Sequence, residues 1–188
     1  MGKFFEKNRR DLVGIIYLVA GLFIVLSLAS FRPTDPSFNS VGSGLHVHNY
    51  CGYFGSFLAD LLFQLWGLPA WLLVAVCAQM SVRNFKNEDA SLLTARSVWG
   101  FLLLVTAASL VALHMPEKKI YSGQIALGGL VGTLVSRGLM AVFNYAGVAV
   151  LLWAIALVLI IFYTEKPLHE IFELPTDWIT FVHKSILE

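Results

Sequence analysis

Four long stretches almost without charged residues constrain this chain more than any other feature. In the clearest, at 146–163, an apolar run from Val148 to Phe162 contains no charge. About 20 apolar residues in a helix span the 30 Å hydrocarbon layer of a bilayer, and a soluble domain carries roughly 25% charged residues. Here only 13% of the 188 residues are charged and 57% are apolar. The sequence therefore predicts an integral membrane protein.

We predict an all-α membrane domain at 12–163, after a cytoplasmic tail at 1–11, with spans at about 12–31, 54–82, 97–113 and 146–163. The second region holds Gly67 and Pro69, which favour a kink or break within it. Residues 69–82 would rise only about 21 Å as a helix. We therefore expect one broken span, with part of the segment before Pro69 inside the membrane.

The stretch 122–143 is apolar but rich in glycine, and it contains the charge of Arg137. A full crossing would carry this arginine through the bilayer, so we expect a short helix docked at the outer face. Gly128, Gly132 and Ser136 are spaced four apart, which places three small residues on one helical stripe. The stripe predicts close packing against another helix, and glycines that serve only as turns are the alternative.

Basic residues orient the four spans. The segments at 1–11, 83–96 and 164–188 hold nine Lys or Arg, whereas the segments on the opposite side hold four, namely Arg32, Lys118, Lys119 and Arg137. Because cytoplasmic segments carry the excess of Lys and Arg, both termini are predicted to be cytoplasmic. The tail at 164–188 has apolar residues near helical spacing and is predicted to be an amphipathic helix interrupted near Pro175.

Few residues suggest chemistry. His46, His48 and Cys51 could supply three zinc ligands, but no fourth ligand lies nearby, so we expect an ordinary loop and no metal. Asp60 and Gln64 lie one helical turn apart, and an ionisable residue at membrane depth suggests a transport site. No other acidic or basic residue lies in a predicted span, so we expect Asp60 to be structural, near the outer water boundary, with Gln64 as a hydrogen-bond partner.

Motifs for catalysis and for nucleotide binding are absent from the sequence. It contains no Gly-x-x-x-x-Gly-Lys-[Ser/Thr], no His-Glu-x-x-His and no Gly-x-Ser-x-Gly. The formal net charge of +1 also excludes a broadly basic surface for nucleic acid. We therefore predict no catalytic residue, no cofactor and no nucleic acid bound by this chain.

Three ordered motifs resemble one known family. Residues 30–38 (SFRPTDPSF), 55–67 (GSFLADLLFQLWG) and 128–136 (GGLVGTLVS) are similar to motifs of the N-terminal four-helix membrane domain of the FtsK/SpoIIIE DNA translocases. The matching positions are Pro33, Asp35, Pro36, Ser37, Leu58, Ala59, Asp60, Gly67, Gly128, Gly129 and Gly132. Two features depart from the family pattern: Phe38 where tryptophan is frequent, and the exit sequence 163–167.

This resemblance implies a bacterial inner-membrane domain that anchors a hexameric chromosome pump at the division septum and contacts divisome proteins. The family's linker, RecA-like ATPase and winged-helix DNA reader are not expected within these 188 residues. The expected partners are the lipid bilayer, divisome membrane proteins and further copies of the chain. The competing interpretation is a small transporter or channel subunit that uses Asp60 and Gln64.

Overall fold

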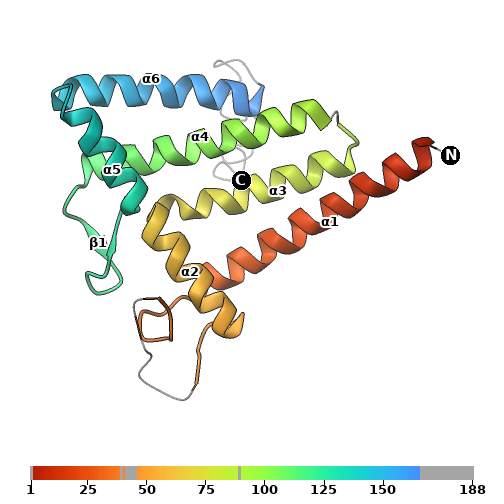
Figure 1. The fold of residues 1–188 in the computed structure, drawn as a ribbon, viewed down its shortest axis with the longest axis horizontal. Coiled ribbons are helices and arrows are strands. Elements are labelled where there is room, and N and C mark those ends of the chain that lie inside the picture. Colours follow the sequence, from red (N-terminus) through yellow and green to blue (C-terminus); the bar gives the residue numbers. More distant parts are fainter. Residues whose placement is uncertain (1, 39, 41–45, 89, 166–188) are drawn as a thin grey trace, which may run out of the picture.

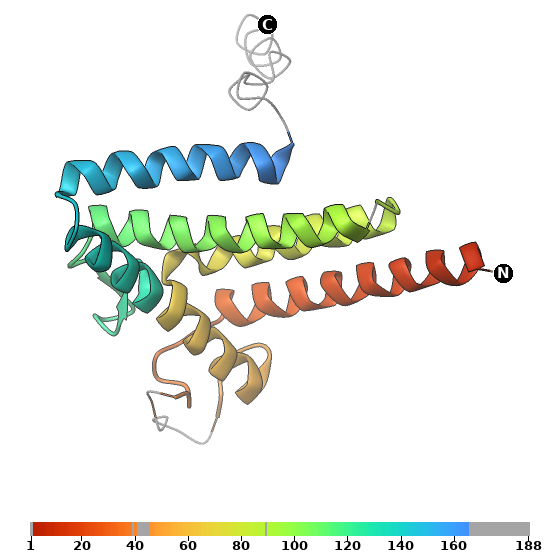
Figure 2. The same ribbon diagram turned by 45° about the horizontal axis from the view of Figure 1, so that its top comes forward.

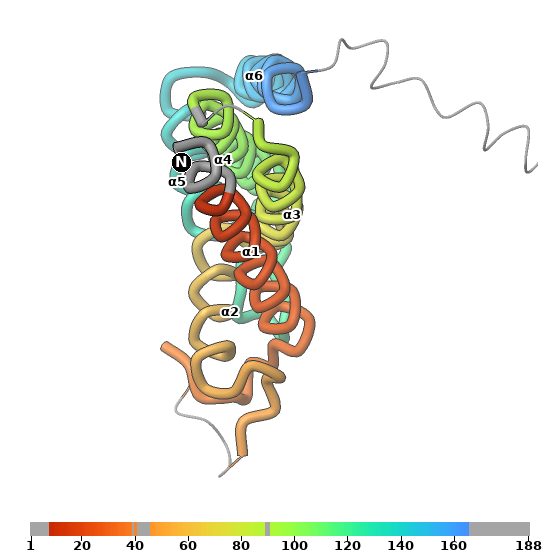
Figure 3. The backbone as a smooth tube through the Cα atoms, turned by 90° about the vertical axis from the view of Figure 1, so that its right-hand side faces the viewer, coloured from red at the N-terminus to blue at the C-terminus, as the bar shows by residue number. Residues whose placement is uncertain are grey.

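Four long helices lie side by side in the computed structural model, which describes residues 2–38, 40, 46–88 and 90–165 (Figure 1). They are α1 (Gly2–Ala29), α3 (Leu72–Phe85), α4 (Ala90–His114) and α6 (Tyr145–Thr164). Helix α1 packs against α3, α3 packs against α4, and α4 packs against α6. Consequently α1 and α6 lie towards opposite edges of the array (Figure 3).

The described residues contain four helical segments long and apolar enough to cross a membrane: Asn8–Ala29, Leu68–Phe85, Ser91–His114 and Tyr145–Thr164. This finding confirms the predicted all-α fold with four membrane-spanning helices. The predicted amphipathic tail falls almost entirely at 166–188, outside the described residues.

Two further helices and a hairpin cover one end of the array. Helix α2 (Gly52–Trp66) leads through the 3₁₀ helix η1 (Leu68–Trp71) into α3, and α5 (Gly129–Met140) precedes α6. Strands β1 (Lys119–Ile120) and β2 (Ile125–Ala126) pair antiparallel between α4 and α5. Helices α2 and α5 pack against each other and run across the direction of the long helices (Figures 1 and 2). We call the α1–α2 loop, α2, the hairpin and α5 the cap.

The opposite end contains the start of α1, the α3–α4 turn and the end of α6 (Figure 2). We call it the basic end, because Arg9, Arg10, Arg83, Lys86 and Arg96 lie there. The predicted sides of the four spans thus correspond to the two ends of the helix array.

Several helix boundaries differ from those expected, most of all the starts of α1 and α4. Helix α1 begins at Gly2, so most of the predicted tail at 1–11 continues the first helix, which ends at Ala29 before the proline-rich loop. Helix α4 begins at Ala90, seven residues earlier than predicted, and therefore contains Arg96. A charge can lie there because Glu88 and Glu165 both pair with the Arg96 guanidinium.

The second predicted span breaks at Gly67, between α2 and η1. Gly67 has a φ of +63°, a conformation that favours glycine. The segment after this break continues to Phe85, three residues beyond the predicted end, and its 18 residues meet the length of a span. Length alone therefore does not require part of α2 to complete this crossing, because η1 and α3 together have the length of a span.

Candidate functional sites in the cap and at the basic end

Asp35, in the first family-like motif, organises the α1–α2 loop. Its side chain is only 1% exposed. The carboxylate accepts hydrogen bonds from the backbone N–H groups of His48 (3.1 Å to each oxygen) and Asn49 (2.9 Å), and His48 Nδ1 lies 3.0 Å from Oδ1. Hydrogen bonds to an ionised acceptor are stronger than neutral ones. Asp35 therefore ties the two ends of the loop together.

Further hydrogen bonds join this loop to α1 and α2. Asn49 Nδ2 donates to the carbonyl of Ser27 (2.8 Å), and Ser56 Oγ donates to the carbonyl of Pro36 (2.8 Å). Tyr50 N donates to Ser30 Oγ (2.9 Å). The motif around Asp35 thus connects the end of α1 with the start of α2.

The structure gives His48 a partner other than a metal ion, because its Nδ1 faces Asp35. Cys51 Sγ lies 3.7 Å from the carbonyl of Phe23 on α1. Within the described part of the chain, no three His, Cys, Asp or Glu side chains gather into a group that could hold a metal ion. His48 therefore acts in the structure as a donor to the Asp35 carboxylate.

Three aromatic rings join the loop, α2 and the hairpin. Phe31 lies next to Phe63 (ring centroids 5.2 Å apart) and Tyr121 (4.9 Å), and the Phe63 and Tyr121 centroids are also 5.2 Å apart. Phe31 and Phe63 are buried. Such aromatic contacts add about 0.5–1.5 kcal/mol per pair beyond the burial of apolar area. The first and second motifs therefore share one core with the hairpin.

The second and third motifs meet at two glycines with positive φ. An ideal Cβ on Gly67 would lie 2.1 Å from the Leu127 carbonyl oxygen, and one on Gly129 would lie 2.5 Å from that of Leu65. Leu68 N donates to the same Leu127 carbonyl at 2.8 Å. The backbone at the end of α2 therefore contacts the backbone at the start of α5, and no residue larger than glycine fits at Gly67 or Gly129.

The small-residue stripe of α5 faces α4. A Cβ on Gly132 would lie 2.2 Å from the Ala108 carbonyl oxygen, and one on Gly128 would lie 2.6 Å from the Ala112 backbone nitrogen. Ser136, the third member of the stripe, is buried. The α4 and α5 backbones therefore approach as closely as in membrane helix pairs with small residues at the contact.

Asp60 differs from its predicted environment. We expected it near the outer water boundary, but it is only 4% exposed because α2 packs against α1 and α5. Its Oδ2 and the Nε2 of Gln64 are buried without a protein hydrogen-bond partner, so the expected bond between these two atoms is not formed. Moreover, the 15-residue helix α2 is not among the four segments with the length and composition of a span.

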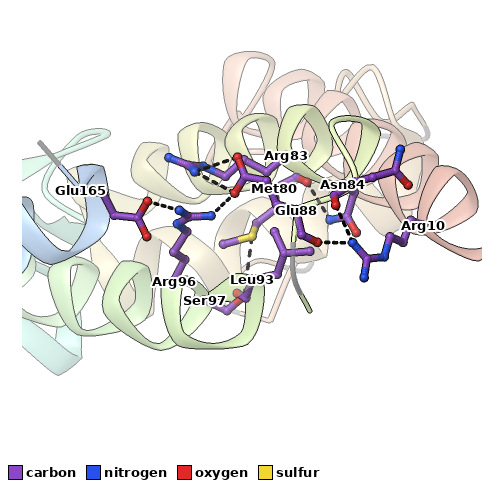
Figure 4. A network of polar contacts seen from close by, with 10 residues as sticks. Arg10, Met80, Arg83, Asn84, Glu88, Leu93, Arg96, Ser97 and Glu165 are labelled. Carbon is purple, nitrogen blue, oxygen red and sulfur yellow. Dashed lines mark hydrogen bonds and ion pairs between the residues drawn. The ribbon is translucent and has the colours of Figure 1, made fainter. Parts of the chain in front are cut away.

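At the basic end, a network of arginine and glutamate side chains connects four helices (Figure 4). Arg83 Nη1 donates to Glu88 Oε2 at 2.9 Å, and Arg96 pairs with both Glu88 and Glu165. Arg10 on α1 donates to the backbone carbonyls of Asn87 (2.7 Å) and Glu88. Partial burial acts to raise the pKa of the Glu88 carboxyl, but hydrogen bonds and charge from Arg83 and Arg96 lower it below its ordinary value.

Sequence reasoning placed the residues of the cap motifs in the outer region but did not predict that the three motifs touch. It also missed the Arg83–Glu88–Arg96–Glu165 network. Part of this network could have been predicted, because Glu88 lies between Arg83 and Arg96 in the segment that joins α3 to α4. A charged residue in a helix that enters a membrane needs a partner. Nothing in the sequence indicated Glu165, which is 69 residues from Arg96.

Comparison with known proteins agrees with the motif resemblance. The family described as the 4TM region of DNA translocase FtsK/SpoIIIE matches residues 6–176. The chain is 29% identical over 143 residues to the DNA translocase FtsK of Shewanella oneidensis, covering 73% of this chain and 15% of that protein. It is 35% identical over 105 residues to that of Azospirillum brasilense, covering 54% and 17%.

The DNA translocase FtsK of Caulobacter vibrioides is 30% identical over 137 residues, which are 71% of this chain and 16% of the relative. The chain thus matches about a sixth of the length of these relatives, and no solved structure matches it. The family match covers most of the sequence and all four apolar helices. The chain therefore belongs to the family of the 4TM region of the DNA translocases FtsK and SpoIIIE.

Proposed function

We propose that this chain is the membrane anchor of an FtsK-type DNA translocase, that it tethers the translocase at the division septum and that it contacts divisome membrane proteins there. The observation that carries the proposal is the family match over residues 6–176, together with four helices suited to spanning a membrane. The family and these helices indicate an inner-membrane protein. The matched region is not the motor of the translocase.

In the proposed orientation, the basic end faces the cytoplasm and the cap faces outwards. The distribution of nine basic residues against four supports this orientation, as does the position of the start of α1 and the end of α6 at the same end of the array (Figure 1). A motor that follows α6 would then lie in the cytoplasm with the chromosome. The anchor itself needs neither ATP nor DNA, and copies of it associate as the motor assembles.

The cap is the proposed site of contact with divisome proteins. We call the Asp35 carboxylate and its backbone donors on His48 and Asn49 the Asp35 clamp. Around this clamp the cap exposes four aromatic side chains: Phe38, Tyr50, Tyr53 and Phe54, each at least 58% exposed. Aromatic residues are enriched both in protein interfaces and at the membrane boundary. These side chains come from the α1–α2 loop and the start of α2, and their exposure fits a docking role better than a transport role.

Localisation tests the proposal. The chain, with a fluorescent protein fused after Glu188, would be expressed in dividing Shewanella oneidensis cells. Fluorescence should concentrate at mid-cell, and a Phe54→Ala/Tyr50→Ala variant should remain in the membrane with a weaker mid-cell band. An even distribution around the membrane for the unaltered chain would refute septal tethering.

The competing transport function requires a titrating Asp60. Asp60→Asn should be as stable as the unaltered chain, because asparagine keeps the shape of the side chain and replaces a buried Oδ2 that has no hydrogen-bond partner to lose. Proton flux into liposomes that contain the purified chain should be at background for both proteins. Flux that is present in the unaltered chain and lost in Asp60→Asn would replace the anchor proposal with a transporter.

A further inference from the structure

A groove opens between α1 and α4 at the basic end, with α3 as its floor. It has a volume of about 270 Å³. The residues that line it are Arg9, Arg10, Val13 and Tyr17 of α1, Met80 and Asn84 of α3, and Leu93, Thr94 and Ser97 of α4. Figure 4 shows Arg10, Met80, Asn84, Leu93 and Ser97 at this end of the helices. The groove is part of neither the cap motifs nor the proposed docking surface.

The depth of the groove matches the boundary of the apolar layer. Arg9 and Arg10 lie at the start of the first apolar segment, Asn8–Ala29, and Thr94 lies near the start of the third, Ser91–His114. Tyr17 is eight residues beyond Arg9, which corresponds to about 12 Å along a helix. The basic residues therefore lie at the level of lipid headgroups, and the apolar residues of the groove lie deeper.

The mouth of the groove is positively charged. The side chain of Arg9 is exposed, and Arg10 is held in place through its bonds to the carbonyls of Asn87 and Glu88. Thr94 and Ser97 add hydroxyl groups on the facing helix. No acidic residue occurs among the described residues that line the groove. This combination favours an anionic group at the mouth.

The size of the groove restricts its occupant. A helix with side chains is about 10 Å in diameter and would not fit a space of this volume, whereas one hydrocarbon chain would. A second groove, between α4 and α6 at the cap, offers a comparison: it is apolar, with Leu103, Ala107 and Trp153 among its lining residues, and His114 is its only ionisable one. Of these two grooves, the one between α1 and α4 combines apolar lining residues with arginines.

We propose that the groove between α1 and α4 binds one anionic phospholipid. The phosphate group contacts the exposed Arg9, beside Arg10, and one acyl chain lies along Val13 and Tyr17. In the proposed orientation this lipid belongs to the cytoplasmic leaflet, whose negative surface attracts basic residues. The site goes beyond the proposed function, because lipid binding here does not depend on a motor, on DNA or on a divisome protein.

Native mass spectrometry of the delipidated full chain in detergent tests the site. Phosphatidylglycerol or phosphatidylcholine would be added and the bound copies counted. We expect one tightly bound phosphatidylglycerol with a clear preference over phosphatidylcholine. Arg9→Gln should weaken phosphatidylglycerol binding about fivefold, the effect of one basic residue at an anionic membrane surface. Lys86→Gln, which removes the same charge from the same end but outside the groove, should leave binding unchanged.

Two further experiments distinguish a groove that binds a whole lipid from a site that binds only its phosphate group. Val13→Trp should fill the groove and abolish phosphatidylglycerol binding while Arg9 and Arg10 remain. Soluble glycerol phosphate should not displace the lipid bound to the unaltered chain, because it lacks the acyl chain. Equal binding of the two lipids, equal losses in Arg9→Gln and Lys86→Gln, or full displacement by glycerol phosphate would each overturn the proposal.

Discussion

The cap and the basic end are held together by different kinds of contact. In the cap, backbones touch at Gly67, Gly129 and Gly132, and Asp35 is buried with backbone donors. At the basic end, long arginine and glutamate side chains bridge between helices and leave grooves beside them. A backbone contact cannot adjust to a larger side chain, whereas a flexible charged side chain can. The cap should therefore be the more sensitive end to substitution.

The largest expected effect is at the α4–α5 contact. Gly132→Leu places a side chain where the Ala108 carbonyl oxygen lies 2.2 Å from an ideal Cβ, so the two helices must separate. We expect a destabilisation of about 3 kcal/mol, the upper end of the usual cost of overpacking, measured as a lower melting temperature in detergent. The matched control is Gly138→Leu on the same helix, where a Cβ meets nothing within 4 Å. Equal effects of the two substitutions would contradict the close contact.

A smaller effect is expected at the Asp35 clamp. Asp35→Ala removes the acceptor of the buried Asn49 N–H and of the partly buried His48 N–H, which should cost about 2 kcal/mol and expose the α1–α2 loop to protease. Asp35→Asn keeps one oxygen acceptor and should lose less. Asp11→Ala, in α1 at the basic end, serves as a control that should leave loop cleavage unchanged. Loop cleavage unaltered in Asp35→Ala would show that the clamp does not hold the loop.

The smallest effect is expected at the basic end. Because the pKa of Glu88 is lowered in the folded chain, its contribution to stability is complete above the ordinary glutamate pKa near 4.3 and is lost as pH falls through the lower folded value. Glu88→Gln should cost about 1 kcal/mol at neutral pH and should flatten the fall in melting temperature below pH 5. Glu117→Gln, at an exposed residue between α4 and the hairpin, should keep the pH dependence of the unaltered chain.

The difference between local features and long-range contacts explains how much of the fold the sequence could predict. Apolar runs identified the four long helices, since length and lack of charge are local properties. The family-like motifs identified Asp35, Gly67 and Gly132 as notable positions. Their partners could not be predicted, because contacts such as Gly67 with Leu127 or Phe31 with Tyr121 join residues distant in sequence.

Two charged residues within helices explain where the structure differs from the sequence-based predictions. The charge of Arg96 predicts the limit of a span, but Glu88 and Glu165 allow Arg96 to lie inside α4. Asp60 was expected near water because it lies close to the start of its apolar segment, but α2 turns at Gly67 and packs into the cap. In both cases the tertiary packing, and not the local sequence, determines the environment of the charge.

Labelling of single cysteines tests most directly whether the two ends lie on opposite sides of the membrane. Cys51 and Cys77 would first be replaced by alanine, and a cysteine would then be introduced at Gln124 in the hairpin or at Asn87 in the α3–α4 turn; the structure places these positions in the cap and at the basic end. A membrane-impermeant maleimide added to intact spheroplasts should label Gln124→Cys, and it should label Asn87→Cys only after the membrane is permeabilised. Labelling of Asn87→Cys in intact spheroplasts would contradict the proposed orientation and the anchor function that depends on it.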